Sequence, residues 1–194
     1  MSEVSEKSTL LNRTTVGFWL YLMTDCILFA SLFATFAVLR DATAQGPSGQ
    51  EIFEMPTALA ETIILLVSSF SSGMALIAMK EKNIRHMYVA LAVTYVLGAS
   101  FLVIEISEFA KFVAEGHSWQ QSAFLSAFFT LVGTHGLHIL TGLIWLLVLV
   151  VALTRKGLTD KVTRQVTLFG LFWHFLDLVW IFIFTVVYLV GTAI

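Results

Sequence analysis

The apolar run from Gly170 to Gly191 constrains the fold of this chain more than any other part of its sequence. As a helix, a run of this length crosses a hydrocarbon core of about 30 Å, yet it carries His174 and Asp177 near its middle. A charged group at that depth costs roughly 2.5–3.5 kcal/mol on insertion scales. Both side chains must therefore face protein, water or a bound group instead of lipid.

Four further long apolar runs precede this one, in a chain of 194 residues that is 58% hydrophobic and 12% charged. Such runs are typical of membrane-spanning helices. The sequence therefore predicts an all-α polytopic membrane protein, a bundle of five transmembrane helices in one domain, residues 16–194, after an N-terminal tail, residues 1–15. The expected spans are 16–39, 55–79, 87–112, 122–153 and 166–192. The first run is too long for the apolar part of a signal peptide and is interpreted as an uncleaved span.

Lysine and arginine residues are distributed unevenly between the two ends of these spans. Nine lie in the N-terminal tail and in the loops after the second and fourth spans: Lys7, Arg13, Lys80, Lys82, Arg85, Arg155, Lys156, Lys161 and Arg164. The opposite side has Arg40 and Lys111 alone. Because cytoplasmic loops carry an excess of basic residues, we expect a cytoplasmic N-terminus and a periplasmic C-terminus. The net charge of −2 gives no indication of nucleic-acid binding.

Ionisable side chains recur inside the predicted spans. They are Asp25, Glu61, Glu105, Glu108, His135, His138, His174 and Asp177. No span has Lys or Arg in its interior, so these acids have no ordinary ion pair at depth. Their available partners are histidines, hydroxyl groups, indole N–H groups, water and one another. We therefore expect several of the acids to be protonated, or to share a proton, and to face inward.

The spacing of these residues predicts how they meet. Six of them form pairs three residues apart, which lie on one helical face: Glu105/Glu108, His135/His138 and His174/Asp177. Counting about 1.5 Å per residue predicts a deep layer with the His and Asp side chains. The three glutamates are expected in a separate layer nearer the outer side.

Each of these groups has a functional and a structural interpretation. The sequence His135-Gly-Leu-His138, together with His174, has the side chains of a metal or haem site. The alternative is hydrogen bonding between helices, which polar residues supply in bilayers. The acids are interpreted either as a proton relay or as hydrogen-bonded structure.

Small and aromatic residues complete the expectations for packing. Gly133, Gly136 and Gly142 favour tight helix packing over an open cavity. Cys26 is expected to be a small buried hydrophobe, and Tyr188 an anchor at the membrane interface. The chain carries no phosphate-binding loop, paired-cysteine metal site or nucleophile elbow. The odd span number and the absence of proline from span interiors weaken a transporter interpretation.

Two long motifs resemble the subunit III family of haem–copper respiratory oxidases. They are Thr134-His-Gly-Leu-His-Ile-Leu-Thr-Gly142 and Trp173-His-Phe-Leu-Asp-Leu-Val-Trp180. Two further segments are similar to the five-helix form found in bacterial bo-type ubiquinol oxidases: Gly17-Phe-Trp-Leu-Tyr-Leu-Met-Thr-Asp-Cys-Ile-Leu-Phe29 and Ile52-Phe-Glu-Met-Pro56. The resemblance covers nearly the whole chain after residue 15.

The resemblance implies an accessory subunit of a proton-pumping terminal oxidase that oxidises ubiquinol and reduces oxygen to water. In this family, subunit I holds the haems and the copper, so no catalytic, cofactor or metal residue is expected here. The expected partners are subunits I and II, a small subunit IV and bound phospholipid, in the bacterial inner membrane. Asp25, Glu54 and Glu108 match acidic positions of the family, and Glu54 matches one linked to lipid.

Two alternatives to this function stay open. One is a membrane anchor for b-type haem, with His138 and His174 as ligands. The other is subunit III of a cytochrome c oxidase, which has the same fold. Longer family members have two additional N-terminal helices that this chain lacks, which puts in doubt any lipid cleft built from them. In quinol oxidases, the small separate subunit is expected in that space.

Overall fold

The computed structural model describes residues 2–44 and 54–193, and these ranges are helical apart from short connections. The helices are α1 (Ser2–Leu39), α3 (Met55–Lys80), α4 (Ile84–Ala114), α5 (Ala123–Lys156), α6 (Asp160–Ile183), the π-helical segment η1 (Phe184–Leu189) and α7 (Val190–Ala193). Five helical stretches in the described ranges are long and apolar enough to cross a membrane. The predicted all-α fold and the number of long apolar helices are thereby confirmed.

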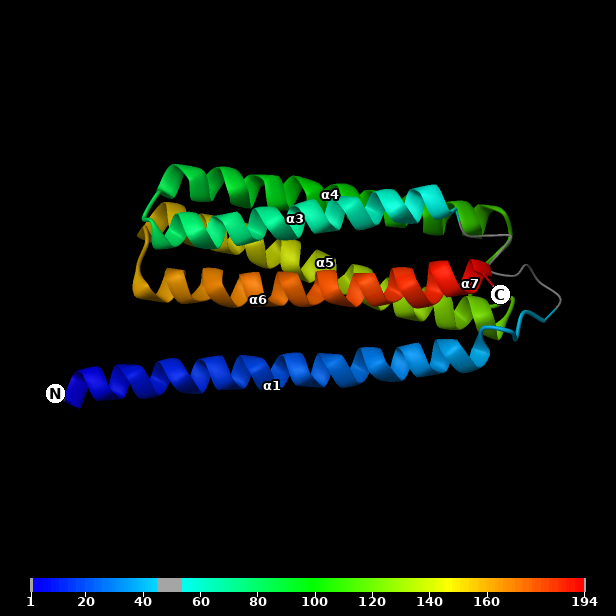
Figure 1. Cartoon of the computed structure of the whole chain (residues 1–194), viewed down its shortest axis with the longest axis horizontal. Helices are drawn as coiled ribbons and strands as arrows, with labels where there is room; N and C mark the ends of the chain where they lie inside the picture. Colours follow the sequence, from blue (N-terminus) through cyan, green and yellow to red (C-terminus); the bar gives the residue numbers. More distant parts are fainter. Residues whose placement is uncertain (1, 45–53, 194) are drawn as a thin grey trace.

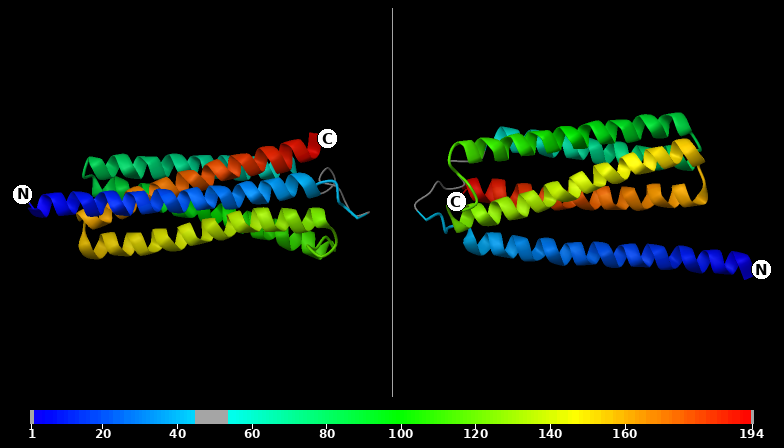
Figure 2. Two further views of the ribbon diagram at one scale, coloured as in Figure 1. Left: turned by 90° about the horizontal axis from the view of Figure 1, so that it is seen from below. Right: turned by 180° about the vertical axis from the view of Figure 1, so that it is seen from behind.

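The helices run antiparallel in sequence order. Figure 1 shows α3 and α4 side by side at one edge, α5 and α6 next to them, and α1 along the other edge. Figure 2 shows α1 lying along the face that α5 and α6 form. The beginning of α1, the α3–α4 turn and the α5–α6 turn lie at one end, and α7 lies at the other. The three basic regions of the sequence therefore share one end of the bundle.

Local sequence signals set the helix ends. Asn83, Ser122 and Thr159 are N-caps whose side-chain oxygens accept hydrogen bonds from backbone N–H groups three residues on, at 3.3, 3.1 and 3.4 Å. Pro56 lies in the first turn of α3. A backbone N–H has no acceptor within the helix there, so proline loses no hydrogen bond. Gly157 ends α5 with φ of 64°, a conformation that glycine adopts without strain.

The helices extend beyond the apolar runs that predicted them. α1 begins at Ser2, 14 residues before the expected first span, and α6 begins at Asp160 instead of residue 166. Apolar runs mark the part of a helix that suits lipid, whereas capping residues in the polar flanks decide where the helix starts. Residues 52 and 53 of the Ile52–Pro56 motif lie outside the described ranges.

A π-helical segment interrupts the last helix at Phe184–Leu189. π-helical turns are rare and occur mostly at single sites within α-helices. Tyr188 lies in this segment and is only 2% exposed. The expectation that Tyr188 anchors the chain at the membrane interface is therefore wrong, because its side chain is buried in the core.

The centre of the bundle is built around the indole of Trp173, which is 1% exposed. A Cβ placed on Gly98 of α4 would lie 2.8 Å from this ring, and one placed on Gly142 of α5 would lie 2.9 Å from it. The ring N–H donates to the Ser68 hydroxyl on α3 at 3.0 Å. One side chain of α6 thus joins three neighbouring helices, and the predicted close approach at Gly142 is confirmed.

Cys26 lies on the outward side of α1 and is exposed. The expectation that it is a buried hydrophobe is wrong. In the described residues, α1 packs mainly on α5 and α6, so much of its surface stays outside the bundle. An apolar run alone does not distinguish a side chain that faces lipid from one that faces protein.

Candidate functional site

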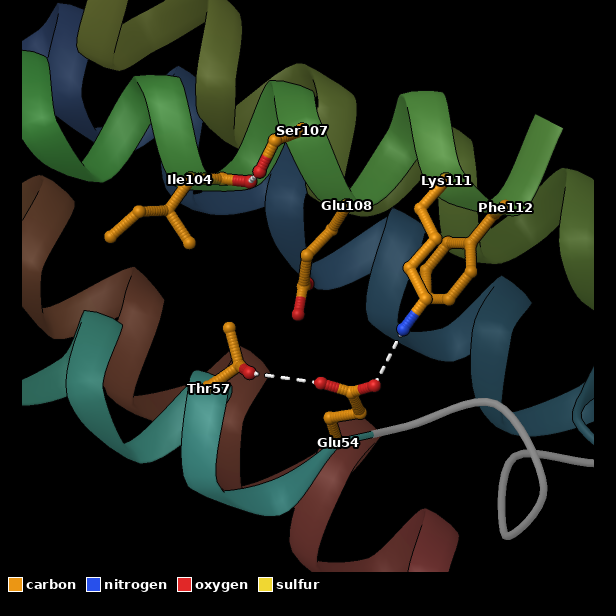
Figure 3. A pocket seen from close by; sticks show the side chains of 7 residues that line it. All are labelled: Glu54, Thr57, Ile104, Ser107, Glu108, Lys111 and Phe112. Atoms are coloured by element: carbon orange, nitrogen blue, oxygen red, sulfur yellow. Dashed lines mark hydrogen bonds and ion pairs between the residues drawn. The ribbon is translucent and has the colours of Figure 1, made fainter. Parts of the chain in front are cut away.

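A pocket of about 190 Å³ opens between the beginning of α3 and the end of α4. Figure 3 shows the Glu54 carboxylate at its mouth, with the Lys111 side chain reaching it from α4. Lys111 Nζ donates to Glu54 Oε1 at 2.6 Å, and Thr57 Oγ1 donates to Glu54 Oε2 at 3.3 Å. The Glu108 carboxyl also points into the pocket. The pocket therefore offers one ammonium group and two carboxyl groups beside apolar walls.

The Lys111 ammonium group lowers the pKa of Glu54 below its ordinary value of 4.5, first through the hydrogen bond and then through charge. A lowered pKa in the folded state means that the charged pair contributes stability above the ordinary pKa, and that this contribution is lost as pH falls through the folded value. Both side chains are about half exposed, so solvent screens the pair and the contribution is small.

We expect Lys111→Met to lower the thermal midpoint of the protein at pH 7 more than Lys82→Met does. Lys82 is an exposed lysine at the opposite end of α3, so its variant changes the net charge equally without touching Glu54. As pH falls through the lowered pKa of Glu54, the difference between the two midpoints is expected to shrink, because protonation of Glu54 removes the ion pair. Midpoints in detergent measured from pH 7 downward test this, and a difference that does not change with pH contradicts it.

Two glutamates lie deeper in the same gap. Glu61 of α3 is 0% exposed and Glu105 of α4 is 3% exposed. The Glu105 carboxyl packs against α5 at Gly136, where a Cβ would lie 3.0 Å from Oε1. Neither carboxyl has a hydrogen-bond partner among the described residues. The prediction that several acids are protonated or share a proton stays a prediction.

Glu61, Glu105 and Glu108 all lie within electrostatic range of the Tyr188 hydroxyl of η1. Glu61 also lies within range of Glu108, and Glu105 lies within range of both. The structure therefore brings the three glutamates together. Tyr188 was not expected in this group. Its only sequence signal is a polar ring in an apolar run, which an interface anchor shares.

His135 is 0% exposed and is enclosed by aromatic rings from three helices. It stacks on Trp180 of α6 at 5.3 Å between ring centroids, and meets the edges of Phe101 of α4 at 5.9 Å and Phe29 of α1 at 6.4 Å. Neither ring nitrogen has a hydrogen-bond partner among the described residues. This histidine therefore serves as a packed ring in the bundle centre.

His138 faces a different neighbour. Its Nε2 lies 3.7 Å from Asp25 Oδ2 on α1, and its Nδ1 lies 2.7 Å from the Thr134 carbonyl oxygen. This contact is a polar link between α1 and α5. Residues three positions apart on a helix point about 60° away from each other, so both histidines lie beside Phe29 of α1, but only His138 lies beside Asp25.

His174 and Asp177 form a third group, with Ser69 of α3. The Ser69 hydroxyl lies 2.6 Å from His174 Nδ1, and Asp177 lies beside both side chains. The His and Asp side chains thus occupy two separate contacts, and the deep layer with these side chains stays a prediction. The serines at positions 68 and 69 were the missed partners, and the run Ser68-Ser69 followed by Ser71-Ser72 in the sequence was the available signal.

The chemistry that these groups support is hydrogen bonding, ion pairing and proton exchange. Among residues 2–44 and 54–193, no group of three or more His, Cys, Asp or Glu side chains is placed to hold a metal ion. His138 faces α1 while His174 faces α3, so the two imidazoles do not flank one space as paired haem ligands would.

Comparison with known proteins gives matches over nearly the whole chain. The family model described as cytochrome c oxidase subunit III matches residues 5–192. The cytochrome bo(3) ubiquinol oxidase subunit 3 of Pseudomonas aeruginosa is 55% identical, over 92% of this chain and 86% of that protein. The protein of the same name from Pseudomonas putida is 51% identical, with coverage of 92% and 86%. A cytochrome c oxidase subunit 3 from Bacillus sp. strain PS3 is 48% identical, with coverage of 91% and 85%.

Proposed function

Because the chain belongs to the cytochrome c oxidase subunit III family, we propose that it is the accessory third subunit of a terminal ubiquinol oxidase. The complex oxidises ubiquinol, reduces oxygen to water and translocates protons. This chain contributes packing and bound lipid to the complex but no redox step. The observation that carries the proposal is 55% identity, over 92% of the chain, to a protein named as this subunit.

The partners follow from this role. Subunit I carries the haems and the copper and packs against this chain, and subunit II and a small subunit IV complete the complex. The N-terminus lies in the cytoplasm and the C-terminus in the periplasm of a bacterial inner membrane. The clustering of basic regions at one end of the bundle supports this orientation.

Phospholipid is the bound molecule that the surface supports best. A pocket of about 220 Å³ between α1 and α6 has almost entirely apolar walls, including Cys26, Phe33 and Phe182, which suits an acyl chain. The pocket between α3 and α4 places Lys111 and two carboxyl groups at the outer end of the bundle. An ammonium group and carboxyl groups complement the phosphate and the amine of a zwitterionic headgroup.

Purification of the complex from its native membrane tests the proposed function. We expect this chain to co-purify with subunits that give a Soret band and contain copper, whereas the isolated chain shows no Soret band. Among the described residues, His138 lies against α1 and His174 against α3, so the two do not pair around one space, which is the physical reason for the second expectation. A Soret band from the isolated chain would support the b-type haem anchor and contradict the proposal.

Subunit III of a cytochrome c oxidase is the second candidate, because a relative of that name is 48% identical. Mass spectrometry of the co-purified subunit II separates the two candidates. Cysteine and histidine ligands for a copper centre in that subunit indicate cytochrome c as the electron donor. A subunit II without them indicates ubiquinol.

A further inference from the structure

Ser69, Gly73, His174 and Asp177 form a polar patch on the groove between α3 and α6. His174 is exposed and Asp177 is partly exposed. The His174 ring lies over Gly73, with ring atoms 4.0 Å from the position that a Cβ would take there. Ser69 holds the ring through its 2.6 Å contact with Nδ1. The imidazole is therefore fixed in place with its other edge directed away from Ser69.

The polar patch lies at the middle of the membrane-spanning helices. His174 and Asp177 are about 21 and 26 Å along α6 from Asp160, at 1.5 Å per residue. Ser69 is about 21 Å along α3 from Met55. These positions place all three side chains near the centre of a hydrocarbon core of about 30 Å.

Lipid tails do not satisfy such groups. Ionisable side chains at this depth almost always face other protein or water, and acyl chains offer no hydrogen bonds. Around the polar patch the surface is apolar, with Phe70 72% exposed and Leu178 53% exposed. In bilayers, polar side chains join neighbouring helices by hydrogen bonds, so a polar patch surrounded by apolar surface suits a contact with another helix.

We propose that the polar patch is the docking contact for a transmembrane helix of a partner oxidase subunit, which brings a hydrogen-bond donor to Asp177 and His174. The identity of the partner rests on the proposed function. Charge complementarity assigns the chemistry: Asp177 is partly exposed, and no lysine or arginine lies at middle depth in the described helices. A guanidinium, amide or hydroxyl group of the partner donates a hydrogen bond to this carboxyl group.

Photo-crosslinking in the intact complex tests this contact. p-Benzoylphenylalanine replaces Leu178, which lies one turn after His174 on the same face. The matched control replaces Val96, which is 60% exposed on α4 at a similar depth. We expect crosslinks from position 178 to another oxidase subunit, with at least fivefold higher yield than from position 96. Equal yields, or adducts with lipid alone at position 178, overturn the proposal.

Two variants of Asp177 give a second readout. After a detergent wash, Asp177→Leu is expected to reduce the amount of this chain per haem at least fivefold, whereas Asp177→Asn, which keeps an acceptor, changes it less than twofold. Full retention of Asp177→Leu overturns the proposal. If Asp177→Leu fails to fold, crosslinking from position 178 in the chain that keeps Asp177 tests the docking contact instead.

The two proposals fail in different ways. A wild-type chain that co-purifies without any haem-containing subunit contradicts the proposed function itself. A chain that co-purifies normally, but does not crosslink from position 178 to a subunit, contradicts only the docking contact.

Discussion

Replacing Trp173 by alanine is expected to lower the free energy of unfolding by about 3–5 kcal/mol, the range measured when large buried aromatics are truncated. Trp173 is 1% exposed and fills the space that Gly98 and Gly142 leave open between α4 and α5. The substitution also removes the N–H donor from Ser68, which is 0% exposed. Glycines on both sides prevent neighbouring side chains from closing the cavity.

Reversible unfolding in mixed micelles measures this loss. Trp19→Ala is the matched control, because Trp19 is 49% exposed on α1 and its removal leaves no internal cavity. We expect a change below about 1 kcal/mol for this control, in line with surface substitutions. Equal losses for the two variants would show that Trp173 does not hold the bundle centre.

Gly142→Ala is expected to cost about 1–3 kcal/mol, the usual effect of overpacking a core. The new methyl group would lie 2.9 Å from the Trp173 ring and 3.2 Å from the Phe172 ring. The Trp173 ring cannot retreat easily, because it also lies against Gly98 on its far side and is hydrogen-bonded to Ser68. Insertion of the methyl group therefore forces α5 and α6 apart.

Gly133→Ala in the same helix is the control for this prediction. Its Cβ would meet only Phe109, at an ordinary 3.7 Å. Alanine favours a helix over glycine by about 0.5–1 kcal/mol, so this variant is expected to be neutral or slightly more stable. Thermal midpoints of the two variants measured side by side test the contrast, and a stable Gly142→Ala variant would contradict the tight packing.

The contrast between these glycines shows what a sequence pattern predicts about packing. Gly133, Gly136 and Gly142 all indicate close helix approach from the sequence, yet only the structure distinguishes their neighbours. Gly142 accommodates an indole and Gly136 accommodates the Glu105 carboxyl, whereas Gly133 has an ordinary contact. The direction of each glycine around the helix decides this, and direction depends on how the helices are rotated in the bundle.

The polar residues show the same difference between what the sequence predicts and what the structure decides. Their positions at membrane depth are readable from the sequence, because hydropathy and the rise per residue place them. Their partners are not readable, since both His135 and His138 lie beside Phe29 of α1, yet His135 stacks on Trp180 and His138 lies beside Asp25. Tyr188 joins the glutamate group from a π-helical segment, which the apolar run does not indicate.

The sequence by itself determined that five long helices form, where their apolar parts lie and which end is basic, because lipid requires continuous apolar runs with internally bonded backbones. The tertiary structure alone decided that Asp25 pairs with His138, that Glu105 sits at Gly136, and that His174 faces outward beside Ser69. Apolar surfaces do not select helix rotation in lipid, so steric fit and individual hydrogen bonds between helices make that selection.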